Sequence, residues 1–282
     1  MINVIGDVCL DIYTKGEPSG LSPEFPVPVI KQTAVDCAAG MGGNVAANVR
    51  ALGGEVTLYA HTADDVAGRR LNAALEGIEL KATHGTAPFT TTKTRIQSSD
   101  GHHYIRIDRD AYINHPLDTL PTSGTAVVAD YGKGTVTEGI MEQLRAASTL
   151  LLIDGHPTAG AGLYQGADIL KLNEREAREW SGFHSLNPHE LTLHILEMSG
   201  AKAVVITLGE HGMLYADRDE KRLTINAKRV KALDVCGAGD TVIASLAVDL
   251  TKGLDIEDAL YNAAGRAAEV VEQAGTAVVR GK

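Results

Sequence analysis

The sequence predicts a doubly wound α/β fold with a mainly parallel sheet and helices on both faces. Three observations support this prediction: short apolar runs recur along the chain, helix-like segments separate them, and no linker-like or low-complexity stretch divides the 282 residues. A hydrophobic content of 44% is ordinary for a chain that buries a sizeable core. We therefore expect a single domain over residues 1–282.

The apolar runs are the expected strands. They are flanked by Gly, Asp or Asn and are apolar at successive positions, which is typical of parallel strands covered on both faces. They occupy residues 3–7, 56–60, 126–130, 150–154, 168–173 and 203–209. Helix-like segments lie at residues 44–54, 137–147 and 173–182. Strand and helix thus alternate, as they do in doubly wound folds.

Two regions interrupt this alternation. Residues 12–35 are rich in proline, and residues 88–108 alternate between polar and apolar side chains around a turn at Gly101. Such segments are typical of extended chain and of a hairpin. We expect them to form a small β lid over an active site, and the alternative is a surface decoration without a role.

Charge and cysteine content exclude several classes of protein. The formal net charge of −10 argues against a general partner for nucleic acid or for an anionic membrane, since both associations depend on accumulated Lys and Arg. The three cysteines are widely scattered and form no CxxC pattern. The N-terminus lacks a basic segment followed by a long apolar one, and no apolar run approaches the roughly 18 residues of a membrane span. We expect a soluble, cytoplasmic protein.

Three small residues, Gly237, Ala238 and Gly239, stand directly before Asp240. The apolar residues that follow have helical spacing, so this turn lies where a helix begins. The first N–H groups of a helix have no internal acceptor and carry the positive end of its dipole, and small residues leave them open to an anion such as a phosphate in transfer. Asp240 beside them is a candidate base for an attacking hydroxyl. The alternative is an ordinary helix-start carboxylate.

Several strings in the same order resemble the ribokinase-like (PfkB) sugar kinase family over essentially the whole chain. These strings are GDVCLD at residues 6–11, GMGGNVAANVRALG at 40–53, KLNEREA at 171–177, ITLGEHG at 206–212 and DVCGAGDTVIASLA at 234–247. The resemblance implies that Asp240 is the catalytic base and that Gly237, Ala238 and Gly239 form the anion hole. ATP and Mg²⁺ are the implied cofactors.

The resemblance also implies how the cofactors are bound. Asn173 and Glu176 would organise Mg²⁺ and its waters, and Mg²⁺ needs few protein carboxylates. A monovalent cation near Asp234 stays open, and the alternative for Asp234 is a structural role at a turn. Further residues implied on the nucleotide side are Lys171, Thr207, Gly209, Gly212 and Asn262.

The acceptor sugar would be bound near the N-terminus. In the family, an aspartate in the first strand-turn and a glycine-rich segment hold the substrate, and here these residues are Asp11, Gly42, Gly43 and Asn44. The sequence departs from the common Gly-Gly opening of that segment, because Ala39, Gly40 and Met41 stand there. We expect Met41 to narrow the sugar site.

Four further strings resemble one branch of the family, the D-glycero-β-D-manno-heptose 7-phosphate kinases. They are GLSPEFPVPVIK at residues 20–31, TKTRI at 92–96, YIRID at 104–108 and ADYGKGT at 129–135. The branch forms the 1,7-bisphosphate that is used to make nucleotide-activated heptose. A substrate that already carries a phosphate needs cations away from ATP, and we expect Arg106 and Lys133 to supply them, ahead of Lys93 and Arg95. As isolated charges, each would be solvated surface.

The chain ends soon after the last helix of the family, so we expect a stand-alone kinase without an adenylyltransferase domain. Lid strands in this family often pair between protomers, which implies a homodimer. Two alternatives stay open: a kinase for another sugar or sugar phosphate, and a sugar- or nucleotide-binding protein that keeps the fold without turnover.

Overall fold

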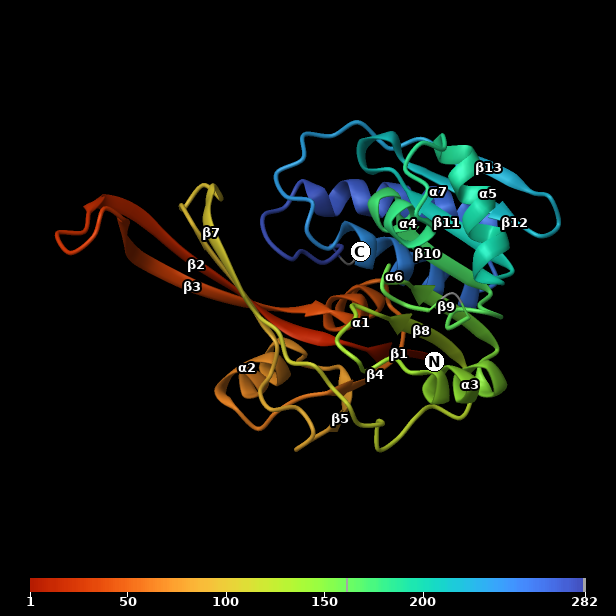
Figure 1. Cartoon of the computed structure of the whole chain (residues 1–282), viewed down its shortest axis with the longest axis horizontal. Coiled ribbons are helices and arrows are strands. Elements are labelled where there is room, and N and C mark those ends of the chain that lie inside the picture. Colours follow the sequence, from red (N-terminus) through yellow and green to blue (C-terminus); the bar gives the residue numbers. More distant parts are fainter. Residues whose placement is uncertain (161, 281–282) are drawn as a thin grey trace.

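The computed structural model describes residues 1–160 and 162–280, and its centre is a nine-stranded sheet (Figure 1). The strand order is β13-β12-β11-β10-β9-β8-β1-β4-β5. Neighbours from β5 to β11 pair in parallel, whereas β12 and β13 are antiparallel. The predicted doubly wound α/β fold is confirmed. The strands are β1 (Ile2–Gly6), β4 (Val56–His61), β5 (Glu79–Thr83), β8 (Thr125–Ala129), β9 (Leu150–Asp154), β10 (Ile169–Asn173), β11 (Ala203–Thr207), β12 (Met213–Asp217) and β13 (Arg222–Ile225).

Successive residues of the central strands enter two different cores. Val4 of β1 and Val127 of β8 belong to one apolar cluster, while Ile5 and Val128 belong to the other. Because side chains alternate across a strand, the two clusters lie on opposite faces of the sheet. The first packs against α1 (Gly42–Ala51), α2 (Val66–Ala74), α6 (Ala238–Thr251) and α7 (Ile256–Val271), and the second against α3 (Glu138–Ala147), α4 (Glu174–Ser181) and α5 (Pro188–Ser199).

A second sheet projects from the body of the molecule (Figure 1). Its order is β3-β2-β6-β7, with β2 (Val8–Leu21), β3 (Pro28–Met41), β6 (Thr92–Gln97) and β7 (His103–Arg109). The strands β2 and β3 extend beyond the predicted segment 12–35 at both ends, because their inner residues are apolar and buried and therefore look like core. The hairpin predicted within 88–108 is β6–β7. That this sheet acts as a lid stays a prediction.

The two faces of the second sheet differ in polarity. Residues directly opposite in a ladder lie on the same face, so the register assigns each side chain to a face. We call one the polar face, and it carries Asp11, Tyr13, Lys93, Arg95, Arg106 and Asp108. We call the other the apolar face, and it carries Ile12, Val35, Thr94, Ile96, Ile105 and Ile107. Because Arg95 is buried and Ile107 is 51% exposed, the polar face points toward the body and the apolar face toward solvent.

Several elements were not predicted from the sequence. These are the helices α2 and α5 and the strands β5, β12 and β13. In α2, β5 and β13 the apolar residues are sparse or half-buried, whereas α5 and β12 carry buried apolar residues that the sequence analysis overlooked. None of the described helices combines the length and the apolar character that crossing a bilayer requires.

Candidate active site

The candidate site lies at the edge of the central sheet where the parallel strands end. Asp154 is the last residue of β9, and Lys171 lies near the end of β10. Asp7 and Asp130 directly follow β1 and β8. Ligands of open parallel sheets bind outside this carboxyl edge. The chain therefore gathers charged side chains where such a fold places its ligand.

The turn before α6 packs against two other residues that were predicted for the site, Asn44 and Lys171. Gly237 has a φ of 81°, in the left-handed region that favours glycine. A Cβ on Gly237 would lie 2.6 Å from Asn44 Nδ2, and one on Gly239 would lie 2.7 Å from Lys171 Nζ. Within the described residues, the amides of Gly239 and Asp240 have no acceptor. Free amides and an ammonium at one helix N-terminus make a place suited to an anion.

The Asp240 carboxylate is buried and is held on both oxygens. Asn44 Nδ2 donates to Oδ2 at 2.8 Å, and the Tyr131 hydroxyl donates to Oδ1. Burial raises the pKa of Asp240, while the two hydrogen bonds and the Lys171 charge oppose that rise. A substrate hydroxyl beside this group would meet a carboxylate that is already oriented, as general-base catalysis requires.

Lys171 forms a buried ion pair at the same edge. Its Nζ lies 2.7 Å from Asp154 Oδ1, and both side chains are at most 8% exposed. Burial alone would lower the pKa of Lys171, but the charges of Asp154 and Glu176 outweigh it and raise the pKa. Lys171 is therefore a permanent cation against the first turn of α6.

Each carboxylate oxygen of Asp11 has one side-chain partner: a guanidinium on Oδ1 and a hydroxyl on Oδ2. Arg95 Nη1 lies 2.6 Å from Asp11 Oδ1, and Thr276 Oγ1 donates to Oδ2 at 2.6 Å. Tyr13 bonds to Thr276 and lies under the Arg95 guanidinium. Burial alone would lower the pKa of Arg95, but Asp11 outweighs it and raises the pKa. The polar face of the second sheet is thus joined to the C-terminal segment at the residue predicted to hold the sugar.

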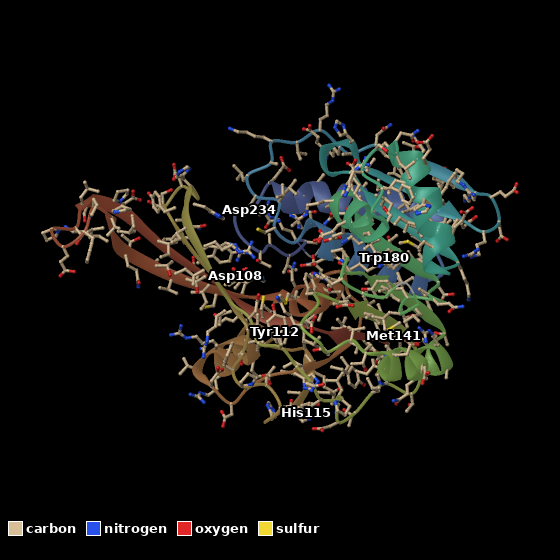
Figure 2. The ribbon with its side chains drawn as sticks, viewed as in Figure 1. Asp108, Tyr112, His115, Met141, Trp180 and Asp234 are labelled. Carbon is tan, nitrogen blue, oxygen red and sulfur yellow. The ribbon has the colours of Figure 1, made fainter. Side chains whose placement is uncertain are left out.

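The two cations predicted to bind the distal phosphate are both paired with carboxylates. Arg106 Nε and Nη2 each lie 2.7 Å from an Asp108 oxygen, and Lys133 Nζ lies 2.7 Å from Asp110 Oδ2. Arg106 lies directly opposite Arg95 in the β6–β7 ladder. In Figure 2, Asp108 lies on the projecting sheet, and Asp234 lies on the body, in the loop that precedes α6. The ladder brings Arg106 onto the face that carries Asp11, whereas Lys133 lies outside the ladder, in the loop that follows β8.

Asn173 and Glu176 form a capping box at the start of α4. Asn173 Oδ1 accepts the Glu176 amide at 2.9 Å, and Glu176 Oε2 accepts the Asn173 amide at 2.8 Å. Each side chain keeps oxygen lone pairs beyond these bonds. Since Mg²⁺ takes most of its ligands from phosphates and waters, this donor set fits it. The metal role stays a prediction.

Of the residues predicted on the nucleotide side, Thr207, Gly209 and Gly212 lie at and just after the end of β11, whereas Asn262 lies on α7. Thr207 ends β11, and Gly209 follows in a short 3₁₀ turn. Gly212 has a φ of 92°, and a Cβ there would lie 2.0 Å from the Ile225 carbonyl oxygen, so the backbone itself requires glycine. Asn262 donates to Asp249 Oδ2 at 2.9 Å and so joins α7 to α6. Asp249 lies nine residues beyond Asp240, or about 13 Å along the helix.

Asp234 has a structural task. Its oxygens accept the amides of Cys236 at 2.9 Å and Gly275 at 3.1 Å. These bonds fix the turn before α6 and attach it to the C-terminal segment. A monovalent cation beside Asp234 stays a prediction.

The glycine-rich segment before α1 is tightly packed. Cβ atoms on Gly42 and Gly43 would lie 3.0 Å from the Asp7 carbonyl oxygen and from Ala39 Cβ. Met41, just before them, is buried and has a φ of 56°, which is uncommon outside glycine. Met41 thus occupies a backbone conformation that glycine adopts more readily. That it narrows the sugar site stays a prediction.

Sequence reasoning missed three residues of this cluster. Asp154 is the last residue of a predicted strand, and this position at the carboxyl edge of the sheet could have indicated that it belongs to the site. Tyr131 lies in the string ADYGKGT, which supported the resemblance to the heptose kinases, but no role was predicted for Tyr131 itself. Thr276 reaches Asp11 across 265 positions of sequence, and no local pattern indicates that contact.

Phosphoryl transfer requires little covalent chemistry from a protein, but it does require an oriented base beside a group of N–H donors. The start of α6 has an oriented carboxylate beside free amides, an arrangement suited to this chemistry, and the fold and the site together match those of a ribokinase-like kinase. The model of the pfkB family carbohydrate kinases matches residues 1–280, and the chain belongs to this family. It is a carbohydrate kinase.

Two relatives in sequence carry the same name. The chain is 33% identical to the Bifunctional protein HldE of Nitrobacter hamburgensis and 34% identical to that of Caulobacter vibrioides, in both cases over 98% of its own length. It spans 60% and 61% of the length of these relatives.

Solved structures share the fold at low sequence identity. Phosphofructokinase-2 from Escherichia coli, in complex with substrates and products, matches with a TM-score of 0.79 at 18% identity, covering 96% of this chain and 92% of that one. Ribokinase from Arabidopsis thaliana, complexed with ribose and ATP, matches with a TM-score of 0.76 at 22% identity, covering 99% of this chain and 96% of that one.

Proposed function

We propose that this kinase transfers the γ-phosphoryl group of ATP to a sugar phosphate, D-glycero-β-D-manno-heptose 7-phosphate, and forms the 1,7-bisphosphate. The observation that carries the proposal is the pairing of two charged regions: the base and anion site at the start of α6, and the arginines of the polar face beside Asp11. The resemblance of the strings around residues 20–31 and 129–135 to the heptose kinase branch supports this sugar.

The chemical step follows from the positions of the side chains. The anomeric oxygen of the sugar attacks the γ-phosphorus, the bond from that phosphorus to the bridging oxygen breaks, and ADP leaves. Asp240 takes the proton of the attacking hydroxyl, since its carboxylate is fixed at the helix start. The amides of Gly239 and Asp240, with the Lys171 ammonium, stabilise the charge on the migrating group. Asn173 and Glu176 would hold Mg²⁺, which neutralises phosphate charge when bound.

The acceptor end of the substrate would lie under the polar face. Asp11 accepts sugar hydroxyls with the lone pairs that Arg95 and Thr276 leave free. Arg106 exchanges its exposed partner Asp108 for the distal phosphate, since Arg binds phosphate in bidentate fashion. Lys133 is the second candidate cation, and its release from Asp110 would be required first.

We also propose a homodimer formed through the apolar face of the second sheet. Ile105 and Ile107 are 52% and 51% exposed and lie on the face that points away from Asp11. A sheet that is apolar toward solvent is typical of an interaction surface. A second copy fits it, because an apolar face is complementary to itself across a two-fold axis.

The test is product formation over a panel of acceptors. The purified chain with MgATP should release ADP and form the bisphosphate with heptose 7-phosphate faster than with fructose 6-phosphate, ribose or the unphosphorylated heptose. Rapid turnover of an unphosphorylated hexose, and none of the heptose phosphate, would reject the substrate. Binding of ATP and sugar without ADP release for any acceptor would favour a non-catalytic binding protein.

A further inference from the structure

Tyr131 lies in the loop that follows β8, and its side chain reaches the start of α6. Its hydroxyl donates to Asp240 Oδ1, across 109 positions of sequence. Asn44 holds the other oxygen, so the carboxylate cannot rotate about its own axis without breaking a bond. We propose that Tyr131 positions Asp240 for proton abstraction and sets the protonation state in which Asp240 waits for the acceptor hydroxyl. This proposal rests on the phosphoryl-transfer function proposed above.

The backbone around Tyr131 is fixed by one buried carboxylate. Asp7 Oδ2 accepts the amides of Tyr131 at 2.9 Å and Lys133 at 3.0 Å, and Asp7 Oδ1 accepts the amide of Thr135 at 3.2 Å. Asp7 directly follows β1, an interior strand of the sheet. Because three amides of the loop converge on a group anchored in the core, the Tyr131 phenol has a defined place rather than a mobile one. Asp7 thereby acts on Asp240 through Tyr131.

The phenol can only act as a donor in this place. Burial raises the pKa of Tyr131 well above its ordinary value, and the negative charges of Asp240 and Asp154 raise it further. Tyr131 therefore stays protonated at neutral pH and below. A neutral donor bonded to a carboxylate favours the ionised form of that carboxylate.

The charge on Asp240 depends on groups from four further elements. Asn44 on α1 donates to it, and Lys171 on β10 favours its ionised form. Asp11 on β2 disfavours that form, and so does Asp154 on β9, whose charge is coupled to that of Asp240. Cys9 on β2 is buried nearby with its pKa raised. Tyr131 and Asn44 are the neutral donors of this set, and the Tyr131 hydrogen bond can be removed by deleting a single oxygen atom.

Loss of the Tyr131 hydrogen bond should shift the pH dependence of the rate in one direction. A base works only when ionised, so the rate falls as the pH falls through the pKa of Asp240. Removal of the Tyr131 donor raises that pKa, because the ionised form loses a hydrogen bond. The acid limb of the kcat profile should therefore move to higher pH.

The experiment measures kcat against pH for Tyr131→Phe with the acceptor that the unaltered enzyme turns over best. We expect kcat at neutral pH to fall about tenfold, as the loss of one hydrogen bond to a charged group implies, and the acid limb to move up by about one unit. The KM for ATP should stay within about twofold. The matched control is Tyr215→Phe, which removes a phenol bonded at 2.9 Å to Asp217 on β12, and it should leave the profile in place.

A double-mutant cycle separates positioning from a structural effect. In an Asp240→Asn background, Tyr131→Phe should cause no further loss of rate, because the group that it positions is absent. Equal losses in both backgrounds, an unchanged acid limb, or the same shift in Tyr215→Phe would overturn the proposal.

A second variant keeps the test valid if Tyr131→Phe unfolds. Incorporation of 3-fluorotyrosine at position 131 keeps the shape of the ring and makes the hydroxyl a stronger donor, so the acid limb should move to lower pH. An unmoved limb would contradict the proposal. Failure of the proposed sugar is a separate result, since it shows in the acceptor panel of the unaltered enzyme, whereas the Tyr131 test runs with any acceptor that is turned over.

Discussion

The carboxyl edge of the central sheet and the projecting sheet hold their charges in different ways. At the edge, Asp240, Lys171 and Asp154 are buried and bonded to partners from other elements. On the projecting sheet, Arg106 and Asp108 are exposed and bonded to each other, two residues apart in one strand. Buried charges are costly to leave unpaired, whereas exposed pairs are weak and easily exchanged.

This difference assigns the two regions different tasks. A site that transfers a phosphoryl group must be preorganised, because its groups contribute only if they do not reorganise during the reaction. A site that recognises one end of a substrate must give up its own pairs when the substrate arrives. In the function proposed above, the edge has the first task and the polar face the second. Arg95 and Asp11, buried but on the polar face, are where the two regions meet.

The largest expected effect tests the preorganised region. Asp240→Asn removes the base while it keeps the size of the side chain, so kcat should fall about 10²–10⁴-fold. The thermal unfolding midpoint should not fall, since a buried carboxylate with a raised pKa is costly to the fold. Steady-state kinetics and a thermal melt check both statements. Turnover close to that of the unaltered enzyme would remove Asp240 from the mechanism.

The second prediction compares two ion pairs of equal length. Lys171→Met leaves Asp154 buried without its cation, and we expect the free energy of unfolding to fall by about 3–5 kcal/mol, together with a loss of activity. Lys202 Nζ lies at the same 2.7 Å from Asp168 but is 69% exposed, so Lys202→Met should cost less than about 1 kcal/mol. Urea unfolding measures both. Equal losses would show that burial does not distinguish the two regions.

The central sheet and the start of α6 could be predicted because their signals are local. Apolar runs mark strands that are buried on both faces, and three small residues before Asp240 mark a helix start. The partners of Asp240 could not be predicted in the same way. Asn44 and Tyr131 are 196 and 109 positions away from it, and only the completed fold brings them together.

The projecting sheet shows the opposite limit. Alternation in residues 92–97 predicts which side chains share a face, yet it does not tell which face meets the body. The polar face meets the body because Arg95 on that face forms a buried ion pair with Asp11. Sequence reasoning placed Arg95 behind Arg106 and Lys133 as a cation for the distal phosphate. In the structure, Arg95 is the arginine bonded to Asp11, the residue predicted to hold the sugar. Lys133, by contrast, is held by Asp110.

The third prediction tests recognition by the polar face. Arg106→Gln should raise the KM for the sugar phosphate about 10–100-fold, since it removes charge-assisted bonds to the distal phosphate, and should change kcat little. The KM for an unphosphorylated analogue should not change. Arg69→Gln is the control, because Arg69 is also exposed and paired with an aspartate, but on α2. An equal rise for both sugars would show that Arg106 does not bind the phosphate.

The smallest expected effect on chemistry tests the face that points away from the site. Ile107→Ser places a polar side chain in the apolar face, opposite Thr94 and on the other side of β7 from Arg106. If two copies associate there, sedimentation should show a dimer that weakens at least about tenfold in the variant, the equivalent of roughly 1.4 kcal/mol. Because Arg106 is not disturbed, the KM for the sugar phosphate should change less than it does in Arg106→Gln. Tyr261→Ser, at an exposed apolar residue of α7, should leave the dimer intact. A dimer of unaltered strength in Ile107→Ser would place the contact elsewhere and would leave the exposed isoleucines without a partner.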